Sequence, residues 1–176
     1  ALQGPASVKI LNALVPGVDE LFFLQSGEFT FLGSPITVSR SGYTGEDGFE
    51  VSISKLDVRK FVEILLNDPD VGLVGLGARD ALRLEAGLCL YGQDLSKEVT
   101  PVEASLSWVI SKRRRKEGNF PGFKIINEQL VNGIKKCRVG ISPFGKAPAR
   151  AGCEIFVNGD RKIGSITSGG YSPTLE

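Results

Sequence analysis

The chain has 176 residues, 41% hydrophobic and 23% charged, a composition typical of a globular protein that buries its own core. With 21 Lys and Arg against 20 Asp and Glu, the net charge of +1 gives no field that would draw the whole chain to nucleic acid or to an anionic membrane. No apolar run approaches the ~20 residues that a transmembrane helix needs.

The first forty residues predict one helix and then short strands. Apolar residues recur at helical spacing from Pro5 until Pro16-Gly17 ends the helix. Strands are expected over 21–24, 28–32 and 36–40, because these apolar runs are separated by glycine, serine and proline.

A glycine-rich loop, Ser41–Gly48, leads into a strand over 49–53. The residues of this strand alternate between apolar and polar, so Glu50 faces away from the apolar side. The apolar side consists of Phe49, Val51 and Ile53.

An amphipathic helix is predicted over 56–67, a short strand over 71–76, and a second helix over 78–86 that Gly87 caps. Strands and helices are interleaved here without a repeating βαβ unit. This pattern favours an α+β fold over a doubly wound parallel sheet.

The last third has a different character. A helix over 123–131 is followed by predicted strands over 136–141, 154–157 and 162–167, with Asn158-Gly159 as a hairpin turn. We therefore place a boundary at 116/117, between an α+β domain (1–116) and an antiparallel β domain (117–176).

Two residue types are absent and one is scarce. The chain has no histidine, which excludes a Ser-His-Asp triad and an imidazole metal ligand within it. Cys89, Cys137 and Cys153 lack CxxC spacing, which indicates free thiols, and we expect no metal. Because methionine is also absent, we expect the chain to be a segment of a longer protein.

Two glycine motifs resemble nucleotide-binding loops. In Gly140–Ala147, Ala147 lacks the hydroxyl that would hold magnesium, so a turn is favoured. In Gly75–Asp80, the charge of Asp80 would repel a pyrophosphate. Neither motif predicts a nucleotide site.

A basic run, Lys112–Lys116, allows three interpretations: a solvated surface, a nucleic-acid contact, or a docking site for an acidic protein. No aromatic residue is interleaved to stack on bases. Among the functional interpretations, the acidic protein partner is favoured.

Glu50 and Arg79 are the charged residues whose positions suggest binding. A carboxylate fixed on a strand can accept two parallel hydrogen bonds from a flat donor edge. Arg79 is predicted in the first turn of its helix, where a cation opposes the helix dipole. The alternative is an ordinary surface ion pair, or two unrelated exposed charges.

Longer motifs carry a family resemblance. The segments Ser39–Glu50, Gly75–Gly92 and Thr100–Glu103 closely resemble the aminomethyltransferases, the T-proteins of the glycine cleavage system. The resemblance extends along the whole chain and implies part of a ferredoxin-like folate-binding domain followed by part of a β-barrel-like C-terminal domain.

The resemblance also implies an activity. In this family a one-carbon unit passes from the aminomethyl-lipoyl arm of H-protein to tetrahydrofolate, with release of ammonia. Glu50, Arg79 and Tyr43 match folate-binding positions, and Leu88 falls at a pocket position. The family's catalytic aspartate lies outside this chain, so no catalytic residue is assigned within it. The run containing Arg113, Arg114 and Arg115 is expected to dock H-protein.

Two relatives of the same fold stay open as alternatives: a folate-binding helper of iron–sulfur cluster assembly, and a folate-dependent demethylase. The helper's Lys-Gly-Cys-Tyr type signature is replaced here by Lys116–Pro121, which has no cysteine. The expected partners are H-protein and the other glycine cleavage components, not nucleic acid or a membrane. The expected location is the cytoplasm for a bacterial source and the mitochondrial matrix for a eukaryotic one.

Overall fold

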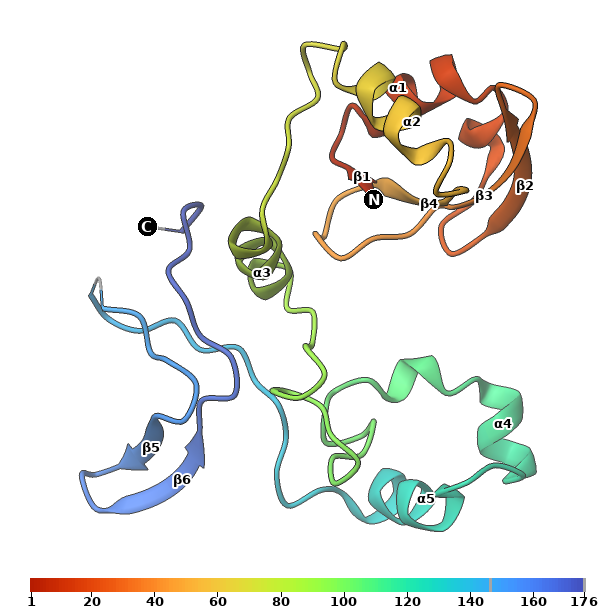
Figure 1. The fold of residues 1–176 in the computed structure, drawn as a ribbon. Helices are drawn as coiled ribbons and strands as arrows, with labels where there is room; N and C mark the ends of the chain where they lie inside the picture. The colour runs from red at the N-terminus through yellow and green to blue at the C-terminus, as the bar shows by residue number, and fades with distance from the viewer. Residues whose placement is uncertain (146, 176) are drawn as a thin grey trace. The chain divides into compact units, whose positions relative to one another are not determined.

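The computed structural model describes residues 1–145 and 147–175. The backbone forms two compact units, residues 1–88 and 89–176 (Figure 1). Both units contain helices and antiparallel strands, so the mixed fold with antiparallel sheets is confirmed. The domain boundary predicted at 116/117 stays a prediction.

The first unit is built around a four-stranded antiparallel sheet with the strand order β1-β4-β3-β2. Two pairs in its register matter for the site: Gln3 lies opposite Gly48, and Ser39 lies opposite Glu50. The strands are β1 (Leu2–Gln3), β2 (Ser26–Phe31), β3 (Ser34–Ser39) and β4 (Gly48–Ser52).

Two helices, α1 (Ser7–Leu14) and α2 (Val58–Leu65), lie over one face of this sheet (Figure 1). The rings of Phe31 on β2 and Phe61 on α2 meet edge to face, with centroids 5.0 Å apart. Phe49 is completely buried in the same core. The predicted alternation along β4 is therefore confirmed, and Glu50 lies on the exposed side of the strand.

The 310 helix η1 (Val18–Glu20) lies between α1 and β2 in the sequence. Helix α3 (Leu76–Glu85) overlaps the helix predicted over 78–86. Two predicted strands are wrong. Residues 21–24 form a turn in which Leu24 has a φ of 65°, outside the extended region. Residues 71–75 are a connection without strand structure, because an apolar run alone does not supply a neighbouring strand to pair with.

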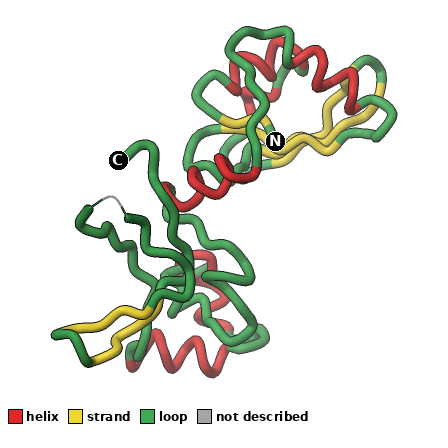
Figure 2. The backbone as a smooth tube through the Cα atoms, turned by 60° about the vertical axis from the view of Figure 1, so that its left-hand side comes forward, coloured by secondary structure: helices red, strands yellow, loops and turns green. Residues whose placement is uncertain are grey.

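The second unit consists mostly of loops around short elements (Figure 2). These are the 310 helix η2 (Ser107–Val109), α4 (Lys112–Glu117), α5 (Phe123–Asn132), β5 (Glu154–Val157) and β6 (Arg161–Ser165). Strands β5 and β6 pair as the predicted hairpin, and both Asn158 (φ 56°) and Gly159 (φ 87°) have positive φ. The connection comprises residues 158–160, because Val157 pairs with Arg161.

The strand predicted over 136–141 is wrong. The backbone N–H of Arg138 donates to the carbonyl of Glu103, and the Ser105 hydroxyl donates to the carbonyl of Arg138. These loop contacts replace a strand ladder. Lys146, in the glycine motif rejected above, lies outside the described residues.

A buried carboxylate ties separate segments of the second unit together. Asp94 accepts hydrogen bonds from the Leu90 backbone N–H (2.8 Å) and from the hydroxyls of Ser168 (2.8 Å) and Thr167. Its side chain is 9% exposed, and these donors satisfy its charge. Asp94 therefore acts as a structural residue of this unit.

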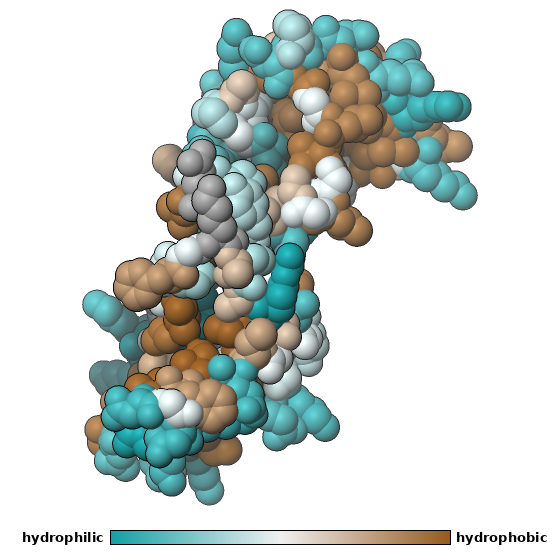
Figure 3. Space-filling view, turned by 90° about the vertical axis from the view of Figure 1, so that its left-hand side faces the viewer, coloured by the Kyte–Doolittle hydropathy of each residue, from teal (hydrophilic) through white to brown (hydrophobic). Residues whose placement is uncertain are grey.

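Apolar side chains stay exposed on both units (Figure 3). They include Phe22, Phe23, Trp108 and Ile125. The three cysteines carry free thiols, as their spacing indicated. None of the helices in the described ranges is long and apolar enough to cross a membrane.

Candidate functional site

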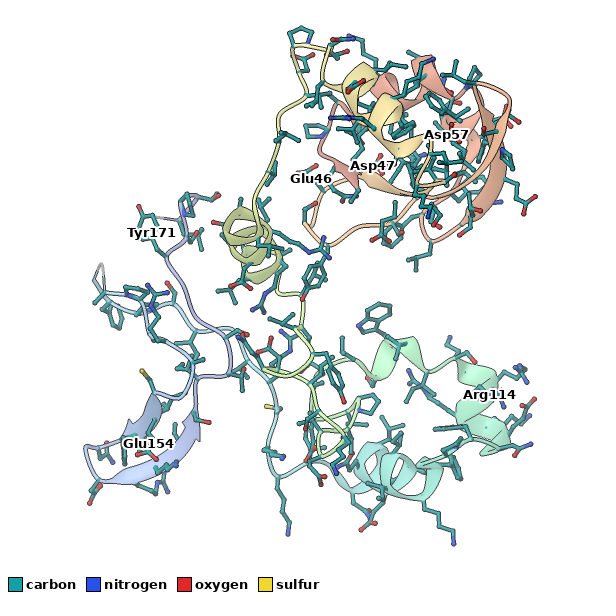
Figure 4. All side chains as sticks on the ribbon, in the orientation of Figure 1. Glu46, Asp47, Asp57, Arg114, Glu154 and Tyr171 are labelled. Atoms are coloured by element: carbon teal, nitrogen blue, oxygen red, sulfur yellow. The ribbon has the colours of Figure 1, made fainter. Side chains whose placement is uncertain are left out.

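The site is built on the first residues of β4 and on the loop that connects β3 to β4 in the first unit, residues 40–47. An ion pair closes its two ends: the Nε of Arg40 lies 3.0 Å from Oδ1 of Asp47, and Nη2 lies 2.6 Å from Oδ2. Figure 4 labels Asp47 and its neighbour Glu46 on this loop. The bidentate geometry fixes the distance between the two ends of the loop and their relative orientation.

Arg40 also anchors the loop to the preceding segment. Its Nη1 donates to the carbonyls of Asp19 (3.2 Å) and Leu21 (2.8 Å), and its guanidinium lies 5.7 Å from the Phe49 ring centroid. The hydrogen bond with Arg40 holds the pKa of Asp47 below its ordinary value, and the same bond raises the pKa of Arg40.

Glu50 extends from β4 on the exposed face of the sheet. The Ser41 hydroxyl donates to its Oε2 at 2.8 Å. Among the described residues, this is the hydrogen bond that orients the carboxylate. An ionised carboxylate has about four lone-pair sites, so most of its accepting capacity stays available for a ligand.

Tyr43 on the loop and Arg79 on α3 are in contact within the first unit. The Arg79 guanidinium, in the first turn of α3, lies over the Tyr43 ring with Cζ 4.9 Å from the centroid. Gly45 explains how the loop and α3 come this close. A Cβ at Gly45 would lie 2.6 Å from Cβ of Ala86, directly after α3. The structure thus brings two of the predicted folate-binding residues together.

The remaining predicted residues lie elsewhere. Leu88 follows α3, and its backbone N–H donates to the carbonyl of Arg83. Arg113, Arg114 and Arg115 lie on α4 in the second unit.

Comparison with known proteins gives the family. Residues 1–114 match the family model described as the GCVT N-terminal domain. The chain belongs to the GCVT family.

The most similar curated GCVT relatives include a "Probable aminomethyltransferase, mitochondrial" of Schizosaccharomyces pombe. It is 50% identical over 177 residues, which cover 99% of this chain and 45% of that protein. The "Aminomethyltransferase, mitochondrial" of Homo sapiens is 46% identical over 178 residues, covering 100% of this chain and 44% of that protein. The chain therefore spans about half the length of the curated relatives it matches.

A solved structure is similar as well. The crystal structure of glycine cleavage system aminomethyltransferase T from Bartonella henselae matches with a TM-score of 0.90 and 44% identity. The match covers 98% of this chain and 47% of that one. The family predicted from the Ser39–Glu50 and Gly75–Gly92 motifs is thus confirmed.

Several residues that build the site in this GCVT chain were not predicted from the sequence. The sequence places Arg40 at the end of a predicted strand and Ser41 and Asp47 in the loop, without a role for them. In the structure Arg40 and Asp47 brace the loop, and Ser41 orients Glu50. A buried arginine was also missed: Arg83 is 1% exposed, and its Nε donates to Asp80 at 2.8 Å. For Arg40 and Asp47, the sequence feature that could have predicted the ion pair is their opposite charges at the two ends of the glycine-rich loop.

Within residues 1–145 and 147–175, no group of three or more Cys, Asp or Glu side chains is placed to hold a metal ion.

Proposed function

We propose that this chain is the folate-binding part of an aminomethyltransferase of the glycine cleavage system. The reaction moves a one-carbon unit from the aminomethyl-lipoyl arm of H-protein to tetrahydrofolate and releases ammonia. The observation that carries the proposal is the exposed Glu50 carboxylate, oriented by Ser41 on the same loop that places Tyr43 against Arg79. Family membership and the names of the relatives support it.

Glu50 is the proposed pterin anchor. The pterin ring presents an N–H beside an amino group, a flat pair of donors that matches the two oxygens of a carboxylate. Ser41 holds the carboxylate in one orientation before the ligand arrives, which lowers the entropy lost on binding.

Tyr43 and Arg79 are proposed to line the same folate site. The ring of Tyr43 offers a face for packing, and its hydroxyl is a donor. The guanidinium of Arg79 offers a positive charge and a planar set of N–H donors. Leu88 is proposed as an apolar lining residue.

The proton-transfer chemistry is proposed to lie outside these residues. The chain has no histidine, and Asp94 and Asp80 make other contacts: Asp94 is buried among hydroxyl donors, and Asp80 pairs with Arg83. We propose that the catalytic aspartate belongs to another part of the protein. The ferredoxin-like and β-barrel-like descriptions of the two family domains are proposed on the same basis.

The basic helix α4 is the proposed docking site for H-protein. Arg113 and Arg114 are exposed, and Figure 4 labels Arg114 on this helix. Arg115 is half-buried instead, and its Nε donates to the carbonyl of Ile110 at 2.8 Å. Docking is therefore assigned to the first two arginines, and Arg115 to the local fold.

The relatives named above are mitochondrial by name. For a eukaryotic source we propose the mitochondrial matrix, and for a bacterial source the cytoplasm.

The test uses a protein of the relatives' full length that contains this chain. Glu50→Gln removes the charge and replaces one acceptor with a donor, so tetrahydrofolate binding should weaken by about 1.5–3 kcal/mol in calorimetry. Glu46→Gln, an exposed carboxylate on the same loop, is the matched control and should leave binding unchanged. Equal affinities for Glu50→Gln and the unmodified protein would contradict the proposal.

Turnover separates the related functions. Formation of methylenetetrahydrofolate from aminomethylated H-protein supports the transferase. Folate binding without this turnover would instead favour the iron–sulfur assembly helper or the demethylase.

A further inference from the structure

Gln3 on β1 contacts the start and the middle of the loop that carries the candidate site, and the start of β4. Its Nε2 donates to the carbonyl of Ser41 at 3.1 Å and to the carbonyl of Phe49 at 3.2 Å. Its Oε1 accepts a hydrogen bond from the Thr44 hydroxyl at 3.2 Å. One side-chain amide thus satisfies three polar groups that lie far away in the sequence.

Two glycines of the loop make room for this amide. A Cβ at Gly42 would lie 1.8 Å from Oε1 of Gln3, and a Cβ at Gly48 would lie 2.5 Å from its Nε2. Neither glycine has a φ in the left-handed region, so backbone conformation does not require glycine at these positions. Space for the side chain of Gln3 is the requirement.

The bonds of Gln3 lead to Glu50 along two short routes. Ser41, whose carbonyl Gln3 holds, donates its hydroxyl to Oε2 of Glu50 at 2.8 Å. Phe49, whose carbonyl Gln3 also holds, directly precedes Glu50 on β4. Moving the Gln3 amide would therefore shift the hydroxyl that orients the carboxylate, together with the backbone from which the carboxylate extends.

We propose that Gln3 is a positioning residue of the folate site, which fixes the orientation of the Glu50 carboxylate through Ser41 and Phe49. This inference rests on the proposed function. Gln3 acts before the ligand binds, and its effect is to hold the loop in the conformation that presents Glu50 to a flat donor edge.

The first experiment compares Gln3→Met with the unmodified protein at the relatives' full length. Methionine matches the length of glutamine but neither donates to the two carbonyls nor accepts strongly from Thr44. The dissociation constant for tetrahydrofolate should rise about 3- to 10-fold, as expected for the loss of ordinary hydrogen bonds. The KM for aminomethylated H-protein should not change.

The control is Gln25→Met. Gln25 belongs to the same unit, and its amide oxygen accepts from the backbone N–H of Phe22 alone among the described contacts. This variant should bind tetrahydrofolate as the unmodified protein does.

A double-mutant cycle separates positioning from a merely structural role. If Gln3 acts through Glu50, Gln3→Met should weaken tetrahydrofolate binding when Glu50 is present. In the Glu50→Gln variant the same substitution should have little further effect. Additive effects in the two backgrounds would overturn the positioning role.

Gly42→Ala tests the contact between the loop and Gln3 by a change in the loop. It replaces Gln3→Met as the test if that variant fails to fold. Its Cβ would press on the Gln3 amide, so tetrahydrofolate binding should weaken. In the Gln3→Ser background, where the amide is gone, Gly42→Ala should have no further effect.

The outcomes of the two proposals are distinguishable. If Glu50→Gln weakens binding while Gln3→Met and Gly42→Ala do not, the positioning role is wrong and the proposed function stands. If Glu50→Gln itself leaves binding unchanged, the proposed function fails and the role of Gln3 fails with it.

Discussion

The guanidinium of Arg79 lies over the aromatic ring of Tyr43, with Cζ 4.9 Å from the ring centroid. The contact joins the loop between β3 and β4 to the first turn of α3. A cation at that end of a helix opposes the helix dipole, which is unfavourable by itself. The electron-rich face of Tyr43 compensates for this placement and keeps the arginine beside the loop.

Arg79→Lys should weaken the contact between the loop and α3, although it keeps the charge. Lysine lacks the planar group that stacks on an aromatic ring. In a double-mutant cycle with Tyr43→Leu, the coupling energy of the pair should be about 0.5–1 kcal/mol from urea unfolding, and the lysine variant should lose part of it. Zero coupling would show that the two side chains lie together without stabilising each other.

Gly45→Ala should destabilise the protein more than Gly33→Ala. Both glycines have positive φ, +82° and +86°, so both variants carry a strain of about 1–2 kcal/mol. Only at Gly45 would the new Cβ meet a neighbour within 4 Å, Ala86, which should add about 1–3 kcal/mol. The measurement is the free energy of unfolding in urea, and equal losses for the two variants would contradict the observed approach of the loop to α3.

Asp47→Asn should lower stability at neutral pH and matter less in acid. Because the pKa of Asp47 is lowered in the folded state, its contribution is present above the ordinary carboxyl pKa and disappears as the pH falls through the lower, folded value. The side chain is 40% exposed, so solvent screening keeps the effect small.

The measurement is the melting temperature of both proteins between about pH 7 and pH 3, across the ordinary Asp pKa. The difference between them should narrow with falling pH. A difference that stays constant would show that the Arg40–Asp47 pair does not contribute. Asp70→Asn, on an exposed turn after α2, serves as the control.

Two arginines of α4, Arg115 and Arg113, should differ in how much they contribute to the free energy of unfolding. Arg115→Ala removes the donor to the carbonyls of Ile110 and Ser107 and should cost about 1–2 kcal/mol of unfolding free energy. Arg113 makes a solvent-exposed ion pair with Glu117, and Arg113→Ala should change stability by less than about 0.5 kcal/mol.

Arg113→Ala combined with Arg114→Ala should instead raise the KM for aminomethylated H-protein and flatten its dependence on salt. Kinetics at several ionic strengths provide the readout. If the KM at low salt is unchanged, α4 is a solvated surface and does not dock the partner.

Local patterns in the sequence were sufficient for several features. The alternation of Phe49, Val51 and Ile53 predicted which face of β4 is buried, and thereby the exposure of Glu50. Helical periodicity predicted α2, and the Asn158-Gly159 pair predicted the β5–β6 hairpin. These features depend on residues a few positions apart, whose periodicity reports burial directly.

The same local reasoning failed where a segment's partners decide its conformation. Residues 21–24 are apolar enough for a strand, but Arg40 takes the carbonyl of Leu21, and Leu24 adopts a positive φ. In the second unit, Arg138 bonds to Glu103 in place of a strand neighbour. Hydrophobicity indicates which residues avoid water, but it does not say which backbone groups will pair.

The family and the elements that carry Glu50, Tyr43 and Arg79 can be predicted from the sequence, because contiguous motifs and short periodicities encode them. The position of Arg79 over Tyr43 and of Gln3 beside the backbone carbonyls of Ser41 and Phe49 is known only from the folded structure. Such contacts join residues that are distant in the chain, and they depend on strand register and on the space that glycines leave. Neither strand register nor this space can be predicted from a local sequence pattern.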